Sequence, residues 1–195
     1  MTKTRLALAL PFALATLAGV AAAPASAQTV RWAAAGDALT MDPHSQNEGP
    51  THVMNHQVYD SLVFRDQAMK LAPRLATSWR ITEDPNVWEF KLREGVRFHN
   101  GRLLTAEDVR ANAVRVRDQV RGGWLSAPMR LVDSLEAPDA RTFVMTMKEP
   151  YGPLLNLLSE LWIVAPESEG WAQTIRQPIG TGPFRFGRWQ PNVSF

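Results

Sequence analysis

The sequence predicts an α/β protein, and three local patterns carry that prediction. The apolar run from Val30 to Ala35 is typical of a short strand buried on both faces. Apolar and polar residues alternate on both sides of Glu83-Asp84-Pro85-Asn86, which is the period-2 pattern of a β-hairpin with one solvated face. Thr105-Ala106-Glu107-Asp108 then supplies a capping hydroxyl and two carboxylates, the composition of a helix start.

The composition is that of a folded domain with little net charge. The 195 residues are 45% hydrophobic and 21% charged, which provides material for a buried core and argues against disorder. Lys3 and Arg5 account for the formal charge of +2, because the residues after position 27 hold 19 basic and 19 acidic side chains. A nucleic-acid partner is therefore not expected. The absence of cysteine excludes disulfides, thiolate metal sites and a cysteine nucleophile.

The first 27 residues have the three-part organisation of a secretory signal peptide. Two positive charges lie in Met1 to Arg5, an apolar run extends from Leu6 to Val20, and Ala25-Ser26-Ala27 supplies small residues before a cleavage point. An uncleaved membrane anchor is the alternative, because the apolar run is long. Pro11 and Pro24 disfavour that alternative. We expect cleavage after Ala27 and a periplasmic mature protein of bacterial type.

A loop and a helix are expected next. Gly36 to Pro50 has loop composition, with Asp-Pro and Gly-Pro as breakers. Thr51 is expected to cap a helix that runs to about Leu62, with Met54 and Val58 at helical spacing on its apolar side.

In the predicted hairpin, large aromatic residues fall on one face of the strands. Trp79, Trp88 and Phe90 are expected to fill the core side. Arg93 to Phe98 is expected to continue this strand system as far as a turn at Asn100-Gly101, where both residues tolerate positive φ.

The helix that opens at Thr105 is expected to continue to Gly122-Gly123, a suitable helix end. Its apolar side holds Val109, Ala113, Val116 and Val120, and the arginines elsewhere on it (Arg110, Arg117 and Arg121) are expected to form a solvated face with Glu107 and Asp118. His99, beside the preceding turn, is interpreted as a hydrogen-bonding residue and not as a ligand of a metal.

The C-terminal half repeats the hairpin pattern before a more irregular end. Residues 134–137 and 143–147 predict a second hairpin around Pro138-Asp139-Ala140. A short helix over Leu154–Leu161, a strand over Trp162–Val164 and a loop over Pro166–Pro178 follow. Gly180-Thr181-Gly182-Pro183 is expected to enter a further strand that includes Phe184, Phe186 and Trp189. Because the sequence stops at Phe195 within an expected strand, we expect an incomplete chain.

No group of residues has the pattern of a catalytic or cofactor site, so neither enzyme activity nor a cofactor is expected. The Gly180 turn lacks the lysine of a phosphate-binding loop, and Pro183 removes a backbone donor there. His52 and His56 are four residues apart, which is half of a zinc site, and His44 is a third ligand in that reading. Solvated helix histidines are the favoured interpretation, and a metal or metal-chelate site is the weaker alternative.

Five stretches in order resemble the extracytoplasmic solute-binding proteins of ABC importers, of the peptide- and nickel-binding class (solute-binding family 5). The resemblance spans essentially the whole mature sequence and is a strong guide to the class, though not to the ligand. The stretches are Leu39-Thr40-Met41-Asp42-Pro43, Tyr59-Asp60-Ser61-Leu62-Val63, LAPRLATSWRITEDPNVWEFKLREGVRFHNGRLLTAEDV (71–109), EAPDARTFVMTMKEPYGPLL (136–155) and PIGTGPFRFGRWQPN (178–192).

This resemblance implies a two-lobe fold of the type II periplasmic-binding-protein class, of which the chain holds part of the first lobe. By similarity, residues 28–54 begin main lobe I, residues 55–170 form an inserted mixed α+β subdomain, and residues 171–195 return to main lobe I, where the chain is truncated. Lobe closure around a solute would need the missing part, so this chain alone is expected to bind no peptide usefully.

The resemblance also implies a function. It implies a monomeric substrate-binding component that captures a short peptide or similar small solute and delivers it to an ABC permease and ATPase complex. Asn47, Glu48 and Gly49, which follow the Asp-Pro motif, and Trp124 are the expected ligand-contacting residues. Glu48 would pair with a ligand ammonium and Trp124 would offer a stacking face. A nickel or metal-chelate ligand, and an enzyme or sensor on the same scaffold, remain the alternatives; peptide, opine, sugar and chelate are all open as ligands.

Overall fold

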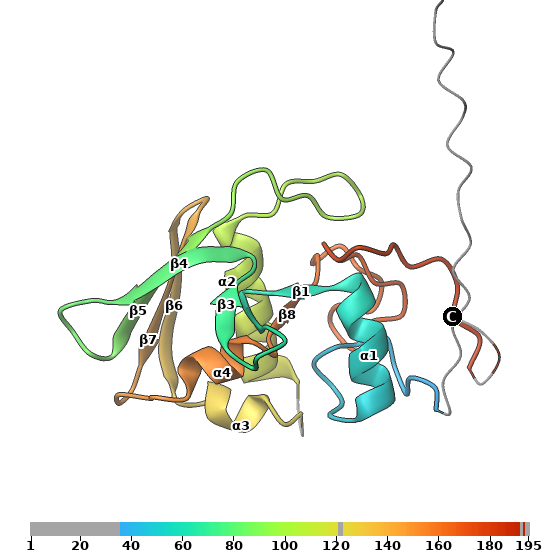
Figure 1. The fold of residues 1–195 in the computed structure, drawn as a ribbon, viewed down its shortest axis with the longest axis horizontal. Helices are drawn as coiled ribbons and strands as arrows, with labels where there is room; N and C mark the ends of the chain where they lie inside the picture. Colours follow the sequence, from blue (N-terminus) through green and yellow to red (C-terminus); the bar gives the residue numbers. More distant parts are fainter. Residues whose placement is uncertain (1–35, 121–122, 192, 194–195) are drawn as a thin grey trace, which may run out of the picture. The chain divides into compact units, whose positions relative to one another are not determined.

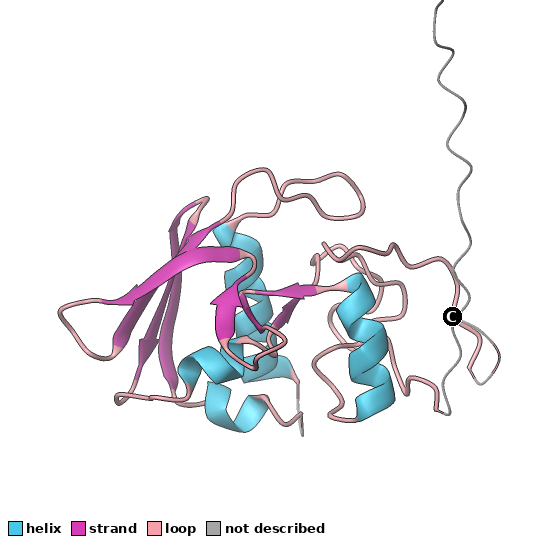
Figure 2. Ribbon diagram, viewed as in Figure 1, coloured by secondary structure: helices cyan, strands magenta, loops and turns pink. Residues whose placement is uncertain are grey.

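A computed structural model of the protein describes residues 36–120, 123–191 and 193. The predicted signal peptide and the predicted strand Val30–Ala35 lie outside these residues. Across the described ranges, helices and strands alternate with irregular segments, as an α/β protein requires (Figure 2). No helix within them has the length and apolar character needed to span a bilayer.

The helical elements are short, and one of them is a π-helical turn that directly follows the second α-helix. The helices are α1 (Gly49–Val58), α2 (Ala106–Val114), the π-helical turn η1 (Arg115–Gln119), α3 (Ser126–Met129) and α4 (Leu154–Leu158). The strands are β1 (Asp60–Ser61), β2 (Val63–Arg65), β3 (Leu71–Pro73), β4 (Ala76–Ile81), β5 (Val87–Leu92), β6 (Val132–Asp139), β7 (Thr142–Met147) and β8 (Trp162–Ile163).

The main sheet has four antiparallel strands in the order β4-β5-β7-β6, seen on the left of Figure 1. Phe90 of β5 pairs with Phe143 of β7, and both side chains are fully buried with ring centroids 5.9 Å apart. Helix α2 packs on β6 and β7 of this sheet and also contacts β8. Its buried residues Val109, Ala113 and Val116 join the same core cluster. Burial of a side chain as large as valine or phenylalanine stabilises the fold by about 2 kcal/mol.

Two smaller strand pairs connect the sheet to α1. Strands β2 and β3 form a short antiparallel pair, and β1 pairs with β8, with Asp60 opposite Ile163 and Ser61 opposite Trp162. The β1–β8 pair therefore brings the chain just after α1 beside a segment about a hundred residues later, next to α2 (Figure 1).

Both predicted hairpins are confirmed, and one predicted extension of them is wrong. Trp88 and Phe90 are buried as expected, whereas Trp79 is only half-buried because β4 is an edge strand of the sheet. The predicted strand from Arg93 to Phe98 is not formed. Strand β5 ends at Leu92, and the chain then turns through Gly95, which has a φ of 72° that favours glycine.

The first helix differs from the prediction at both ends. Its N-cap is Glu48, whose carboxylate accepts from the Thr51 backbone N–H, so Thr51 is not the cap. The helix ends at Val58 and not near Leu62, since Tyr59 is already extended where the chain enters β1. Pairing with β8, which local sequence does not reveal, ends the helix early.

The second helix starts as predicted and ends earlier. Thr105 forms a capping box with Asp108, whose carboxylate accepts from the Thr105 backbone N–H at 2.8 Å. The helical path ends at Gln119, because Val120 is extended, so the predicted end at Gly122-Gly123 is wrong. Arg121 and Gly122 lie outside the described residues. Arg110 pairs with Glu107 and Arg117 pairs with Asp118, as predicted for the solvated face of this helix.

Among the remaining C-terminal predictions, some are confirmed and one is wrong. Helix α4 and strand β8 are present but shorter than expected, and Pro166–Pro178 is irregular as predicted. The predicted strand over Phe184, Phe186 and Trp189 is not formed. Instead, the Gly182 backbone N–H donates to the Val58 carbonyl at 2.9 Å, and the next bond joins Phe184 to Gln57. This segment satisfies carbonyls left free at the end of α1, which takes it away from strand pairing.

Candidate functional site

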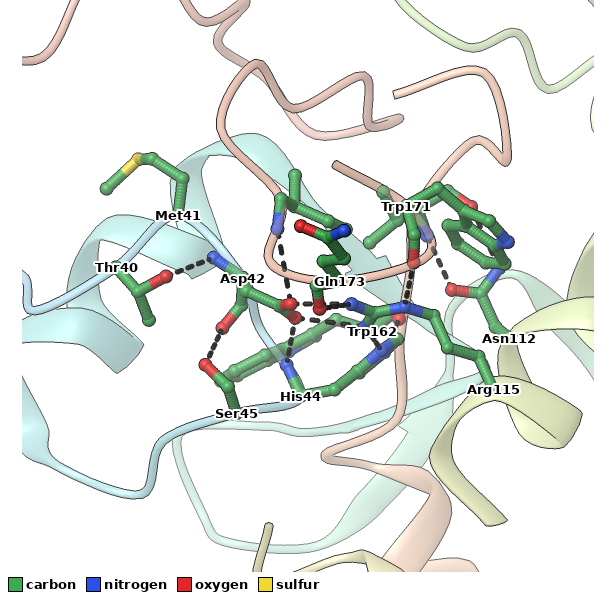
Figure 3. Close-up of polar contacts among 12 residues, drawn as sticks. Thr40, Met41, Asp42, His44, Ser45, Asn112, Arg115, Trp162, Trp171 and Gln173 are labelled. Atoms are coloured by element: carbon green, nitrogen blue, oxygen red, sulfur yellow. Dashed lines mark hydrogen bonds and ion pairs between the residues drawn. The ribbon is translucent and has the colours of Figure 1, made fainter. Parts of the chain in front are cut away.

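A buried polar cluster joins the loop before α1 to the helix α2–η1 (Figure 3). The cluster consists of Asp42, His44 and Arg115, which we call the Asp42–His44–Arg115 cluster. The Arg115 guanidinium binds both oxygens of the Asp42 carboxylate, at 3.0 Å and 2.6 Å, and each side chain is 1% exposed. A bidentate ion pair of this kind fixes the relative orientation of the guanidinium and the carboxylate as well as their distance.

Arg115 has an acceptor for each of its five N–H donors. Besides the two Asp42 oxygens, it donates to the His44 Nδ1 at 2.7 Å. It also donates to two backbone carbonyls of the following loop, Trp171 at 2.8 Å and Gln173 at 3.2 Å. Its side chain also lies over the Trp171 ring, with the guanidinium carbon 5.3 Å from the ring centroid. One side chain therefore ties together three separate parts of the chain.

His44 occupies the cluster as a neutral imidazole. Its Nε2 lies 2.8 Å from the Trp162 carbonyl, which can only accept, so Nε2 carries the proton and Nδ1 accepts from Arg115. Burial, reinforced by the positive charge of Arg115 and opposed by Asp42, lowers the pKa of His44 to about 4. Protonation of Nδ1 would place a donor against a donor and break the contact with Arg115.

Asp42 holds the cluster together from the loop side. Burial by itself would raise the pKa of the Asp42 carboxyl, but hydrogen bonds from Arg115 and its charge outweigh this effect and lower the pKa. The same carboxylate accepts from the backbone N–H groups of His44 and Ile175, at 3.1 Å and 3.3 Å. A buried carboxylate with this many donors remains ionised, so the cluster is a structural ion pair and not an acid–base group.

The backbone around Asp42 is fixed by further short-range bonds. Its N–H donates to the Thr40 hydroxyl at 3.0 Å, and its carbonyl accepts from the Ser45 hydroxyl at 3.2 Å. The Tyr59 hydroxyl donates to the Met41 carbonyl at 2.7 Å, and burial raises the pKa of Tyr59. The loop that leads to the expected ligand residues therefore starts from a rigid base.

The expected ligand residues Asn47, Glu48 and Gly49 lie at the start of α1. Asn47 and Gly49 are exposed, and a Cβ added to Gly49 would meet no atom within 4 Å. Glu48 caps the helix through its Oε1, which accepts from the Thr51 N–H and hydroxyl. Among the described residues no hydrogen bond or ion pair is found for its Oε2, so one carboxylate oxygen is available to a further donor.

The fourth expected ligand residue, Trp124, follows Gly123, which contacts the loop before α1. Trp124 is half-buried against the main core. Gly123, immediately before it, packs closely on the backbone of His44: a Cβ at this glycine would lie 2.6 Å from the His44 carbonyl oxygen. The structure thus brings the residue before Trp124 against His44, three positions before Asn47, although the two are far apart in sequence.

In the structure, the histidines of α1 face the Trp162 ring and are not gathered with further metal-binding side chains among the described residues. His52 and His56 each meet the Trp162 ring edge-on, with centroids 4.9 Å apart in both cases. The His52 Nδ1 lies 3.9 Å from the Glu160 carboxylate. Both ring nitrogens of His44 are already bonded, to the Trp162 carbonyl and to Arg115, which is not the arrangement of a third ligand beside His52 and His56. Over the described part of the chain, no three acidic, histidine or cysteine side chains could together hold a metal ion.

His99 is a hydrogen-bonding residue, as predicted. Its Nδ1 accepts from the Gly180 N–H at 3.3 Å and its Nε2 donates to the Gly182 carbonyl at 2.9 Å. The turn at 180–183 is thereby held by backbone and side-chain bonds to His99.

Two adjoining surface hollows, of about 280 Å³ and 400 Å³, lie elsewhere on the protein. They share Asp60, Phe64 and Arg74, and the Arg74 guanidinium is bound to Asp60 at 2.6 Å. None of the expected ligand residues lines either hollow.

Sequence reasoning missed Arg115, and a usable signal was present. Asp108, Asn112 and Arg115 recur at helical spacing and all three are buried, so α2 has a polar stripe on an inward face. Asn112 uses both ends of its amide, accepting from the Val164 N–H at 3.0 Å and donating to the Val164 carbonyl at 2.8 Å. A polar stripe beside apolar positions on the same helix indicates buried hydrogen bonding to another segment.

The geometry can now be set beside known proteins. Residues 70–195 match the family described as bacterial extracellular solute-binding proteins, family 5 Middle. The chain is 30% identical over 185 residues to the glutathione-binding protein GsiB of Escherichia coli strain K12, and this similarity covers 93% of the chain. GsiB of Shigella dysenteriae is 29% identical over 168 residues. The chain spans about a third of the length of these relatives, 36% and 33% respectively.

Solved structures agree with the sequence similarity. The chain superposes on DppA of Helicobacter pylori in complex with peptide STSA with a TM-score of 0.69 at 29% identity, covering 80% of this chain and 36% of DppA. NikA of Brucella suis in complex with Fe(III)-EDTA gives 0.69 at 30%, covering 80% and 32%. AgaA of A. tumefaciens R10 in complex with agropinic acid gives 0.73 at 26%, again covering 80% and 32%.

The structural neighbours are type II periplasmic binding proteins, so the predicted fold class is confirmed for the part that the chain covers. The family match extends over more than half of the chain, from residue 70 to residue 195. This chain belongs to the bacterial extracellular solute-binding proteins of family 5.

Proposed function

We propose that the chain is the N-terminal part of the substrate-binding component of an ABC-type importer. It captures a short peptide or a similar small solute in the periplasm and delivers it to a membrane permease and ATPase complex. The family match over residues 70–195 carries this proposal. The sequence expectations of cleavage after Ala27, a monomer and no enzyme activity belong to the same proposal.

A short peptide is the favoured solute class. GsiB is named as a glutathione-binding protein, and DppA was solved with a peptide. The exposed residues Asn47 and Gly49, and the free Oε2 of Glu48, present hydrogen-bonding groups at the start of α1. A carboxylate oxygen with no partner among the described residues suits the ammonium end of a peptide, and the half-buried ring of Trp124 supplies an apolar face.

A metal chelate is the second candidate. NikA, with Fe(III)-EDTA bound, is as similar to this chain in sequence as GsiB is. A chelated metal brings its own ligands, so the lack of a three-ligand group in the described residues does not conflict with this solute.

Calorimetry on the full-length protein tests both candidates. Glutathione, the dipeptide Ala-Ala and nickel–histidine are titrated separately into the same preparation. Saturable binding of glutathione or Ala-Ala with no response to nickel–histidine is the expected result. Binding of nickel–histidine alone would favour the second candidate. Hydrolysis of the peptides, with no saturable binding step, would overturn the proposed function.

A further inference from the structure

One side chain anchors both segments that carry the expected solute contacts. Arg115 binds the Asp42 carboxylate and the His44 ring, and His44 lies three residues before Asn47. The helical path that begins at Arg115 ends at Gln119, and the chain then leads to Gly123, which packs on the His44 carbonyl. Arg115 therefore lies at the base of two loops that meet each other.

The anchor depends on the particular chemistry of arginine. All five N–H donors of Arg115 have acceptors, and two of them engage Asp42 in a paired geometry that a lysine ammonium does not reproduce. The π-helical turn starts at this residue, where the Val120 N–H reaches back to the Arg115 carbonyl at 3.0 Å. Single π-helical turns inside helices often mark functional positions.

Among the described residues, few hydrogen bonds hold the loop beyond the cluster. Ser45 is tied back to the Asp42 carbonyl, and the next bonds are those of Glu48 at the start of α1. Asn47 is exposed between these two fixed ends. The position of Asn47 relative to Trp124 therefore depends on how firmly the Asp42 end is held.

From this geometry we infer that Arg115 is a positioning residue for solute binding: it touches no solute but holds Asn47–Gly49 and Gly123–Trp124 in one arrangement. The inference rests on the proposed function and assigns a role within it to a buried residue of α2–η1. Loss of the anchor gives the two loops more than one relative position, and the population competent to bind falls accordingly.

The test uses Arg115→Lys and Arg115→Met in the full-length protein, with Kd for glutathione and Ala-Ala measured by calorimetry. Both variants are expected to raise Kd for the peptide that the wild type binds by at least about tenfold, the methionine variant more than the lysine variant. Arg110→Met is the matched control, because Arg110 is an arginine of the same helix that pairs with Glu107 at the surface. It is expected to leave Kd unchanged.

A second control separates positioning from general loss of stability. Val109→Ala removes two buried methyl groups from the same helix and should lower the unfolding temperature without changing Kd. Amide hydrogen exchange without solute gives an independent readout: the Arg115 variants should exchange faster at residues 44–49 and 123–124 than Val109→Ala does.

The possible outcomes are distinct. Wild-type Kd in a folded Arg115→Lys or Arg115→Met variant overturns the inference, as does an equal rise in Kd in Val109→Ala. If the wild type binds neither peptide, the peptide solute class of the proposed function fails, and Kd for nickel–histidine is compared in the same variants. A wild type that binds none of the three solutes overturns the proposed function, and the inference, which rests on it, fails with it.

Discussion

Asp42 and Arg115 form a bidentate ion pair across 73 residues of sequence, and each side chain is 1% exposed. Asp42 belongs to the loop that leads into α1, and Arg115 begins the π-helical turn after α2. Carbonyls of Trp171 and Gln173 complete the coordination of the guanidinium. Segments from the beginning, middle and end of the described chain are thus held by one interaction, whose removal has measurable consequences.

Replacing Arg115 with methionine should lower the free energy of unfolding by about 3–5 kcal/mol, because it leaves the Asp42 carboxylate buried without its counter-charge. Urea unfolding followed by circular dichroism measures the change. Arg110→Met, at an exposed ion pair, should change the same quantity by less than about 1 kcal/mol. Equal losses in the free energy of unfolding would show that the buried ion pair contributes no more to stability than the exposed one.

Acid should destabilise the protein through His44. The pKa of His44 is about 4 in the folded protein and 6.5 for the ordinary group. Between these two pH values the unfolded chain binds a proton at His44 that the folded protein does not. The contribution of His44 to the free energy of unfolding is therefore complete above about pH 6.5 and is lost as the pH falls to 4. The loss is on the order of 3 kcal/mol.

Urea midpoints of the wild type and of His44→Gln, measured from pH 7.5 to pH 4, test this dependence. Burial also lowers the pKa of His56, and the Asp42 carboxyl acts in the same direction at lower pH. The difference between the two proteins removes the contribution of His56 and isolates that of His44. A wild-type protein and a variant with the same pH slope would contradict the prediction.

Gly180 should not tolerate a side chain. A Cβ at this position would lie 1.9 Å from the Val58 carbonyl oxygen, so Gly180→Ala requires a backbone shift at the end of α1. We expect a loss of about 2 kcal/mol or more in the free energy of unfolding. Gly152→Ala is the control, because a Cβ there meets nothing within 4 Å and the change should stay within about 0.5 kcal/mol. A neutral Gly180→Ala would show that the 180–183 turn is displaced in solution.

Glu48→Gln should weaken binding of peptides with a free N-terminus. Glutamine keeps an oxygen that can cap α1, and the substitution removes the charge that would pair with a ligand ammonium. In the full-length protein, Kd for Ala-Ala should rise about tenfold or more, which corresponds to one charge-assisted hydrogen bond. Kd for N-acetyl-Ala-Ala should be the same in both proteins. An unchanged Kd for Ala-Ala would remove Glu48 from the proposed site.

Patterns that depend on neighbouring residues were readable from the sequence. The alternation around residues 83–86 predicted the hairpin of β4 and β5, because a strand with one buried face alternates wherever it lies. Thr105 and Asp108 predicted the start of α2, since capping bonds form within four residues. The five family-like stretches carried the class of protein through their order along the chain.

Features set by distant partners were not readable in this way. Helix α1 ends at Val58 because residues 60–61 pair with β8, a hundred positions later. Phe184 and its neighbours were predicted as a strand from their alternation, yet they donate to the last carbonyls of α1. In both cases a tertiary contact replaced the structure that local pattern favoured.

The sequence by itself therefore determined the two hairpins and the start of α2, because periodicity and capping bonds act between neighbouring residues, and its resemblance to family 5 indicated the class of protein. Only the tertiary structure decided that Arg115 is buried and that the loops of Asn47 and Trp124 adjoin. An arginine on a helix is ordinarily solvated, and its burial is stable only where a carboxylate and enough acceptors converge on it from elsewhere in the chain. That convergence at Asp42 and His44 is a property of three-dimensional packing.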